Sequence, residues 1–143
     1  MSFKKYQQYP TVQNFARKWP DKQITHAPIY CSVDLRDGNQ ALINPLTVEQ
    51  KLEYFKALVK MGFKQIEVSY PSASDTDFNF TRKLIEEDLV PDDVAIQILI
   101  PAKKEWIKKS VEAMSEVKMG FFTYIIQQMS FKEELFFKKV MMR

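Results

Sequence analysis

The stretch that decides the fold is "PIYCSVDLRDGNQ", residues 28–40. Its first half is apolar and predicts a buried strand over residues 28–34, and its second half gathers charged and amide side chains within a few positions. A helix start follows, because Thr47 is a favoured N-cap residue before "VEQKLEYFKALVKM", which ends at Gly62. Strand, polar loop and helix in this order predict the first unit of a parallel α/β fold.

The same order recurs twice along the chain. Apolar runs predict strands over residues 63–70 and 94–100, and helical spacing predicts helices over residues 75–87 and 103–117. Three βα units in series predict a parallel sheet, either in a (β/α) barrel or in a doubly wound fold. No Gly-rich phosphate loop follows the first strand, which disfavours the dinucleotide-binding alternative. Residues 1–27 show neither period and predict an extended arm.

Composition bounds the class of protein. The 143 residues carry 21 basic and 18 acidic side chains with no basic stripe, so we expect no nucleic-acid partner. No apolar run reaches the length of a membrane span and no secretory signal is present, so we expect a cytoplasmic protein with no membrane partner. Cys31 is the single cysteine, which excludes an internal disulfide, and we expect a small buried hydrophobe rather than a reactive thiol.

Candidate site residues follow the predicted strands, where the loops of a parallel sheet converge. Asp37 offers a hard oxygen ligand to a divalent ion, and Arg36 offers a positive fork to a developing enolate or carbonyl oxygen. Gln40 can orient a substrate, and Glu67, which we expect at the end of the second strand, is a second inward-facing candidate. The alternatives are an Asp-Gly turn with solvated charges and a polar strand face. His26 is expected to be a surface histidine rather than a ligand.

Three stretches carry a family resemblance. These are "YPTVQNFARKWPDKQITHAPI", "APIYCSVDLRDGNQALINPLTVEQK" and "LVKMGFKQIEVSYPSASDTDFNFTRKLIEEDLVPDDVAIQIL". Together they resemble the N-terminal part of the long form of 2-isopropylmalate synthase over roughly residues 8–117. The resemblance implies a (β/α)8 barrel with a divalent metal (Mg, Mn or Zn) that condenses acetyl-CoA with 2-oxoisovalerate in leucine biosynthesis. It also implies a homodimer for the full-length family.

The resemblance assigns roles residue by residue. Asp37 matches the metal-ligand aspartate, Arg36 matches the arginine that steadies the oxyanion, and Gln40 matches a glutamine near the metal. Glu67 stands where the family also carries glutamate, with no firm role. The family's metal site also needs a His-x-His pair from a later strand, whereas His26 is the only histidine in this chain.

The chain departs from the family pattern near the expected substrate loops. The family usually has Trp at the position of Tyr30, Gly-Phe at Ser69–Tyr70, and a Thr-Gln-Ala-Arg type stretch where this chain has "IPAKKEW". Tyr30 lies within the first predicted strand, and the other departures lie at the ends of the second and third. Substrate contacts in these loops therefore cannot be carried over from the resemblance.

Residues 118–143, "KMGFFTYIIQQMSFKEELFFKKVMMR", do not follow the family pattern. Back-translated and read one base upstream from Lys118, they fit the family's fourth-strand pattern F-H-x-Y-N-S-T-S-x-x-Q-R-R, which predicts a frameshift. The alternative is a divergent helix and strand. A three-unit sheet would leave the strand 94–100 at an edge, so we expect "GFFTYII" either to dock there as a fourth strand or to drive association.

The expected organisation is therefore an arm (1–27), a partial barrel (28–117) and an out-of-family tail (118–143). The expected function is 2-isopropylmalate synthase, here as a truncated chain that is inactive alone. Homocitrate and citramalate synthases share the barrel chemistry, although "VDLRDGNQAL" favours the isopropylmalate branch. The alternative from another class is a non-catalytic remnant or interaction module.

Overall fold

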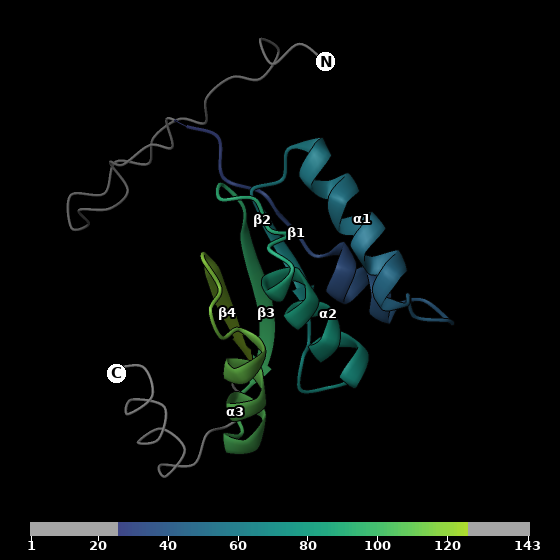
Figure 1. Cartoon of the computed structure of the whole chain (residues 1–143), viewed down its shortest axis with the longest axis vertical. Coiled ribbons are helices and arrows are strands. Elements are labelled where there is room, and N and C mark those ends of the chain that lie inside the picture. Colours follow the sequence, from purple (N-terminus) through teal and green to yellow (C-terminus); the bar gives the residue numbers. More distant parts are fainter. Residues whose placement is uncertain (1–25, 126–143) are drawn as a thin grey trace, which may run out of the picture.

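The computed structural model describes residues 26–125 (Figure 1). Strands and helices alternate along this part of the chain. In chain order the elements are β1 (Cys31–Ser32), the π-helical turn η2 (Asp34–Gly38), α1 (Val48–Met61), β2 (Gln65–Ser69), α2 (Asp75–Glu86), β3 (Ala95–Pro101), α3 (Lys104–Ala113) and β4 (Gly120–Ile125).

The four strands form one parallel sheet in the order β1-β2-β3-β4. All three helices lie on the same face of the sheet (Figure 1), as expected when crossovers between sequential parallel strands share the usual right-handed sense. A parallel sheet whose strands follow sequence order, with helices on one face only, is a sector of a (β/α) barrel wall. The predicted α/β class and partial barrel are therefore confirmed.

The core lies between this sheet and the helices. It is formed by the apolar side chains that helices and strands direct toward one another: Phe55, Leu58, Phe80, Leu84, Ile107, Ile66, Val68, Ile96, Ile98 and Ile100. Each such side chain contributes about 1.5–3 kcal/mol when it is fully removed from water. The opposite face of the sheet, which is the inner side of a barrel, carries the polar residues described below.

Helix boundaries follow the local signals in the sequence. Thr47 caps α1 in a capping box with Gln50, and α1 ends at Gly62, whose φ of 97° is left-handed. Ser74 caps α2 by accepting a hydrogen bond from the backbone N–H of Asp77. The predicted helix 48–61 is thus confirmed at both ends.

The first strand and the third helix are much shorter than predicted, and β2 is also shorter than the expected 63–70. The first strand was expected over residues 28–34, but only Cys31 and Ser32 pair with β2, because Pro28 to Tyr30 are exposed and η2 begins at Asp34. The third helix was expected to reach residue 117 but ends at Ala113, with Met114 as its C-cap. The chain then turns through Glu116, whose φ is 65°, before it enters β4.

The start of the predicted tail is a strand. Residues Gly120 to Ile125 pair in parallel with Ile96 to Pro101, so the edge that a three-unit sheet would leave open at β3 is covered. Docking of the segment as a fourth strand, one of the two expected outcomes, is observed. Most of the predicted arm (1–25) and the rest of the tail (126–143) lie outside the described residues. No helix within residues 26–125 is long and apolar enough to cross a membrane.

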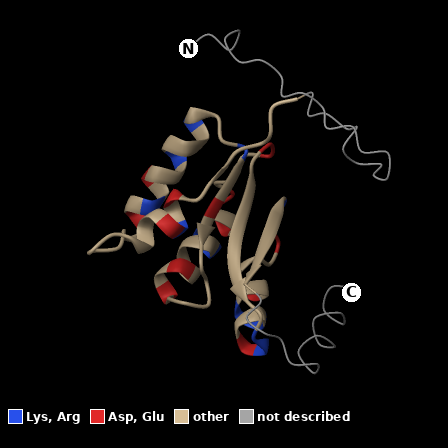
Figure 2. Cartoon of the chain, turned by 180° about the vertical axis from the view of Figure 1, so that it is seen from behind, with Lys and Arg blue, Asp and Glu red and all other residues tan. Residues whose placement is uncertain are grey.

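Charged residues are spread over the helices. Both Lys and Glu occur along α1 and α3 (Figure 2), and two contacts join neighbouring helices. Lys109 of α3 lies 3.1 Å from the carboxylate of Asp75 at the start of α2. Arg82 of α2 donates to the carbonyl oxygen of Ser115, 2.9 Å away, just beyond the end of α3. These contacts fix the helices to one another around the sheet.

Candidate functional site

The turn η2 aims the charged stretch of the sequence back over the sheet. The carbonyl oxygen of Val33 accepts hydrogen bonds from the backbone N–H groups of Arg36, Asp37 and Gly38, at 3.2, 2.9 and 3.3 Å. Leu35 is fully buried in the core and anchors the turn. Because the turn is wound tightly around one carbonyl, Arg36 is directed toward the neighbouring strand rather than into solvent.

Arg36 forms an ion pair with Glu67 of β2. Its Nη2 lies 2.9 Å from Oε2 of Glu67, and Nη1 pairs with the carboxylate of Asp37. The Glu67 side chain is 1% exposed and that of Arg36 is 15% exposed. A carboxylate this deeply buried needs a charged partner to offset its desolvation. Glu67 is the middle residue of β2, so the prediction that it stands at the end of this strand is wrong.

Two polar atoms of this pair have no partner in the described part of the chain. They are Nε of Arg36, a donor, and Oε1 of Glu67, an acceptor, and both are buried. Buried polar atoms are almost always hydrogen-bonded in proteins, and exceptions often mark places that a ligand or water occupies. The pair therefore offers one donor and one acceptor to a small polar molecule.

A row of polar side chains continues from this pair across the inner face of the sheet. Gln97 of β3 stands directly opposite Glu67 in the register. Its Oε1 accepts a weak hydrogen bond from the Cys31 thiol, with sulfur and oxygen 3.8 Å apart. Its Nε2 donates to Oγ1 of Thr123, 2.6 Å away. Cys31 is partly buried and not fully buried as expected, and this partial burial raises the pKa of its thiol.

Sequence reasoning missed Gln97, although a signal was present. It is the one amide or charged residue in the otherwise apolar strand "AIQILIP". A polar side chain in a central strand needs hydrogen-bond partners, and such partners lie on neighbouring strands. The identity of those partners depends on the register, which is not visible in the sequence.

Gln40 lies in a different place from Arg36 and Glu67. It is exposed and lines a cavity of about 580 Å³ between the loop after η2 and the first turns of α1 and α2. Asn39, next to it, is nearly buried and accepts a hydrogen bond from the backbone N–H of Leu46, 2.7 Å away, which closes this loop. Arg36 and Glu67 are not among the lining residues of this cavity.

A second buried ion pair supports the wall of this cavity. Lys51 of α1 is completely buried and pairs with Asp77 of α2, which lines the cavity. The Lys51 ammonium also lies 5.4 Å from the centre of the Phe80 ring. The other carboxylate oxygen of Asp77 accepts a hydrogen bond from the backbone N–H of Tyr70, 2.9 Å away. Lys51 therefore links α1 to the loop that follows β2.

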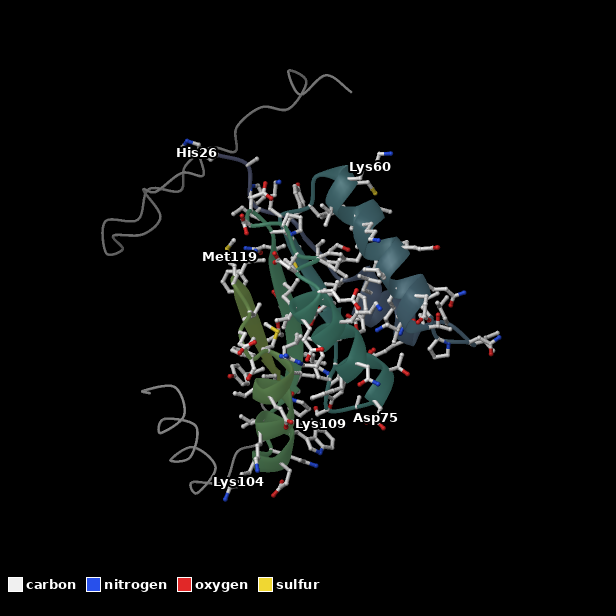
Figure 3. All side chains as sticks on the ribbon, viewed as in Figure 1. His26, Lys60, Asp75, Lys104, Lys109 and Met119 are labelled. Atoms are coloured by element: carbon white, nitrogen blue, oxygen red, sulfur yellow. The ribbon has the colours of Figure 1, made fainter. Side chains whose placement is uncertain are left out.

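The described residues do not make a complete metal site. Within residues 26–125 no three His, Cys, Asp or Glu side chains are grouped so that they could hold a metal ion. Asp37 is 54% exposed and already pairs with Arg36, and Asp34 accepts a 2.5 Å hydrogen bond from the Ser32 hydroxyl. His26 precedes β1 and lies at one end of the sheet, whereas Asp75 and Lys109 lie at the other end (Figure 3). Asp37 is thus the one predicted metal ligand among the described residues, and its carboxylate pairs with Arg36.

The fold and the site together define a parallel β/α barrel sector with a charged pair joining its first two strands. Residues 27–133 match the HMGL-like family, and the chain belongs to that family. The match extends past Lys118 into the segment that the sequence pattern set apart.

Curated relatives that match the chain are named 2-isopropylmalate synthase. The protein of Clostridium acetobutylicum is 50% identical over 139 residues, which are 97% of this chain and 25% of the relative. That of Parafrankia sp. is 54% identical over 114 residues, 80% of this chain and 20% of the relative. That of Corynebacterium efficiens is 57% identical over 102 residues, 71% of this chain and 18% of the relative. The chain thus spans a quarter or less of the length of these relatives.

Proposed function

We propose that this chain supplies the first strands of a 2-isopropylmalate synthase active site, which condenses acetyl-CoA with 2-oxoisovalerate in leucine biosynthesis. The observation that carries the proposal is the buried Arg36–Glu67 pair with its open donor and open acceptor. Family membership and the names of the relatives support it. We further propose a cytoplasmic location and, for the full-length protein, a homodimer.

The condensation joins the methyl carbon of the acetyl thioester to the keto carbon of the oxo acid. The methyl group loses a proton, the keto oxygen becomes negative and takes up a proton, and hydrolysis of the thioester releases CoA. In this scheme Arg36 stabilises the oxygen that becomes negative, because a fixed guanidinium in a water-poor site needs no reorganisation. Glu67 holds the guanidinium in place through Oε2 and keeps Oε1 as an acceptor for substrate.

Asp37 and Gln40 complete the proposed roles. Asp37 would provide one ligand of a divalent metal (Mg, Mn or Zn), and a bound metal supplies Lewis-acid polarisation of the keto group. The remaining ligands must come from outside the described residues, because the described part groups no such set. Gln40 would orient substrate from the cavity that it lines beside η2.

A non-catalytic interaction module is the second candidate function. Phe121, Phe122 and Ile125 of β4 are exposed, and apolar side chains on an edge strand favour association with another chain. Homocitrate and citramalate synthases, which the sequence left as alternatives within the enzyme class, would differ in the oxo acid that they accept.

Two assays test the proposal. The purified 143-residue chain should show no condensation of acetyl-CoA with 2-oxoisovalerate, because one carboxylate cannot hold a metal and orient both substrates. A chimera in which residues 27–117 of this chain replace the matching part of the Clostridium acetobutylicum relative should be active, because it leaves out the segment predicted to be out of frame. Arg36→Ala in the chimera should lower kcat by at least about 100-fold, as the loss of an oxyanion-stabilising donor does.

The control variant is Lys56→Ala, an exposed position on α1, which should leave the chimera's kcat unchanged. Gln40→Ala should raise KM more than it lowers kcat, since Gln40 is proposed to orient substrate. Turnover by the isolated chain, with mass spectrometry excluding a full-length contaminant, would contradict the expected inactivity. An active chimera that is unaffected by Arg36→Ala would contradict the role of the charged pair.

A further inference from the structure

On the inner face of the sheet, the side-chain amide of Gln97 could donate a hydrogen bond to the carboxylate of Glu67 but does not. Gln97 and Glu67 are direct neighbours on adjacent strands, which lie about 4.7–4.9 Å apart in a sheet. An amide donor beside a buried carboxylate normally donates to it, because a charge-assisted hydrogen bond is roughly twice as strong as a neutral one. Even so, Oε1 of Glu67 has no partner within residues 26–125.

The reason lies in how the Gln97 amide is held. Its nitrogen donates to Thr123 on β4 at 2.6 Å, and its oxygen accepts from the Cys31 thiol on β1 at 3.8 Å. The amide is therefore anchored at both ends along the row, with Thr123 as the stronger anchor, because a thiol is a weak donor. Turning toward Glu67 would break the contact with Thr123.

We propose that Thr123, assisted by Cys31, is a positioning residue that holds the Gln97 amide away from Glu67. In this chain, Oε1 of Glu67 is thereby kept available to accept a hydrogen bond from a small molecule that carries an O–H or N–H group. The inference rests on the hydrogen bonds of Gln97 and on the register of β2, β3 and β4, and not on the proposed function, because Thr123 lies in the segment predicted to be out of frame. Thr123 acts through Gln97 and Glu67, so it needs no contact with that molecule.

The test follows the side-chain amide of Gln97 by proton–nitrogen NMR of the full chain, without substrate. Gln97→Leu assigns the signal by its loss. In Thr123→Val, which keeps the branched shape and removes the hydroxyl, the Gln97 amide proton should move downfield because it now donates to a charged carboxylate. A crystal structure of this variant should place Nε2 of Gln97 within hydrogen-bond distance of Oε1 of Glu67. Thr123→Ser keeps the hydroxyl and should retain the native signal.

Cys31→Ala provides a second measurement that does not alter β4. In this variant the Gln97 amide proton should move downfield by less than in Thr123→Val. The proposal is overturned if the Gln97 signal of folded Thr123→Val stays at its native position. It is also overturned if Thr123→Ser gives the same change as Thr123→Val, because the hydroxyl would then be irrelevant. Neither measurement involves turnover, so an inactive chimera would count against the proposed function and leave this result unaffected.

Discussion

Nη2 of Arg36 and Oε2 of Glu67 lie 2.9 Å apart, and this contact joins the turn after β1 to the middle of β2. β1 itself pairs with β2 through only Cys31 and Ser32. The ion pair therefore supplements a very short ladder at the edge of the sheet. It serves the stability of this edge in addition to the chemistry proposed for it.

Glu67→Ala should lower the free energy of unfolding by about 3–5 kcal/mol, because it leaves the Arg36 guanidinium largely buried without its main partner. Glu67→Gln should cost less, since the amide oxygen still accepts a hydrogen bond. Urea unfolding followed by circular dichroism measures both. Glu53→Ala, at an exposed position on α1, is the control and should change stability by less than about 0.5 kcal/mol. Equal effects of Glu67→Ala and the control would show that the pair contributes nothing to stability.

Lys51→Ala should destabilise the chain by about 3 kcal/mol, because it leaves Asp77 without its ammonium partner and opens a space beside Phe80. Lys51→Met should cost less, since its apolar side chain refills that space although the charge is lost. Thermal melts of the two variants separate packing from charge. If Met is as damaging as Ala, the ion pair rather than the packing of the side-chain stem determines the loss.

The ends of α1 and α2 provide a matched pair of backbone variants. Both helices end in a Schellman motif. In α1 the backbone N–H of Phe63 donates to the carbonyl oxygen of Leu58, and in α2 the backbone N–H of Leu89 donates to that of Leu84. The left-handed position is Gly62 in α1 but Asp88, with φ of 50°, in α2.

Gly62→Ala should therefore destabilise the chain by about 1 kcal/mol, whereas Asp88→Gly should stabilise it by a few tenths of a kcal/mol to about 1 kcal/mol. Asp88 also pairs with the exposed Lys118, a contact worth little in water, so its loss should not reverse the sign. Urea unfolding of both variants is the measurement. Destabilisation by Asp88→Gly would mean that the contact with Lys118 outweighs the backbone strain.

Local signals explain what could be predicted from the sequence. The bounds of α1 follow from Thr47 and Gly62, a cap and a left-handed position that act within one helical turn. The strands β2 and β3 could be predicted from their apolar runs, because a buried strand of any parallel sheet has such a run. Arg36 and Asp37 could be predicted as site residues because the sequence alone shows a polar stretch directly after an apolar strand.

The features that were missed depend on residues far apart in the chain. The partner of Arg36 is 31 positions away, and the partners of Gln97 stand on β1 and β4. The central position of Glu67 in β2 and the pairing of Gly120 to Ile125 with β3 are set by register, which no local pattern encodes. Gln40 was placed with the charged pair because of its closeness in sequence, yet the loop after η2 carries it to the neighbouring cavity.

Stability should fall at alkaline pH because three partly buried groups resist ionisation. Burial raises the pKa of Cys31 above its ordinary value of 9.0 and those of Tyr70 and Tyr124 above 10.0. These groups stay protonated in the folded chain at pH values where the unfolded chain releases the protons. The unfolded state then binds fewer protons, so the free energy of unfolding decreases as pH rises from about 9.

Urea midpoints between about pH 7 and pH 10.5 measure this dependence. Cys31→Ser removes the thiol and should flatten the first part of the decline, near pH 9. Tyr54→Phe is the control, because Tyr54 is exposed on α1 and should leave the profile unchanged. A midpoint that stays constant across this pH range would show that the thiol and the two phenols ionise alike in both states.

We predict that the nucleotide sequence across codon 118, read one base upstream, encodes the F-H-x-Y-N-S-T-S-x-x-Q-R-R pattern of the family. The matched family region runs to residue 133, so the segment occupies the place of the family's next strand, and β4 pairs with β3 there. Its exposed Phe121, Phe122 and Ile125, with no charge from Gly120 to Ile125, make it a template for intermolecular pairing.

The chain as it stands should therefore elute from a size-exclusion column as oligomers or be poorly soluble, and restoring the frame and extending through the barrel should give a soluble, metal-binding protein. Phe121→Lys tests the cause, because a charge on an exposed strand residue opposes edge-to-edge association. Lys108→Glu, a charge change at an exposed position on α3, is the control and should not alter the elution. A monodisperse, cooperatively melting monomer, together with codons that give no family pattern in the neighbouring frame, would mean that the segment is a divergent version of this strand and that the frameshift reading is wrong.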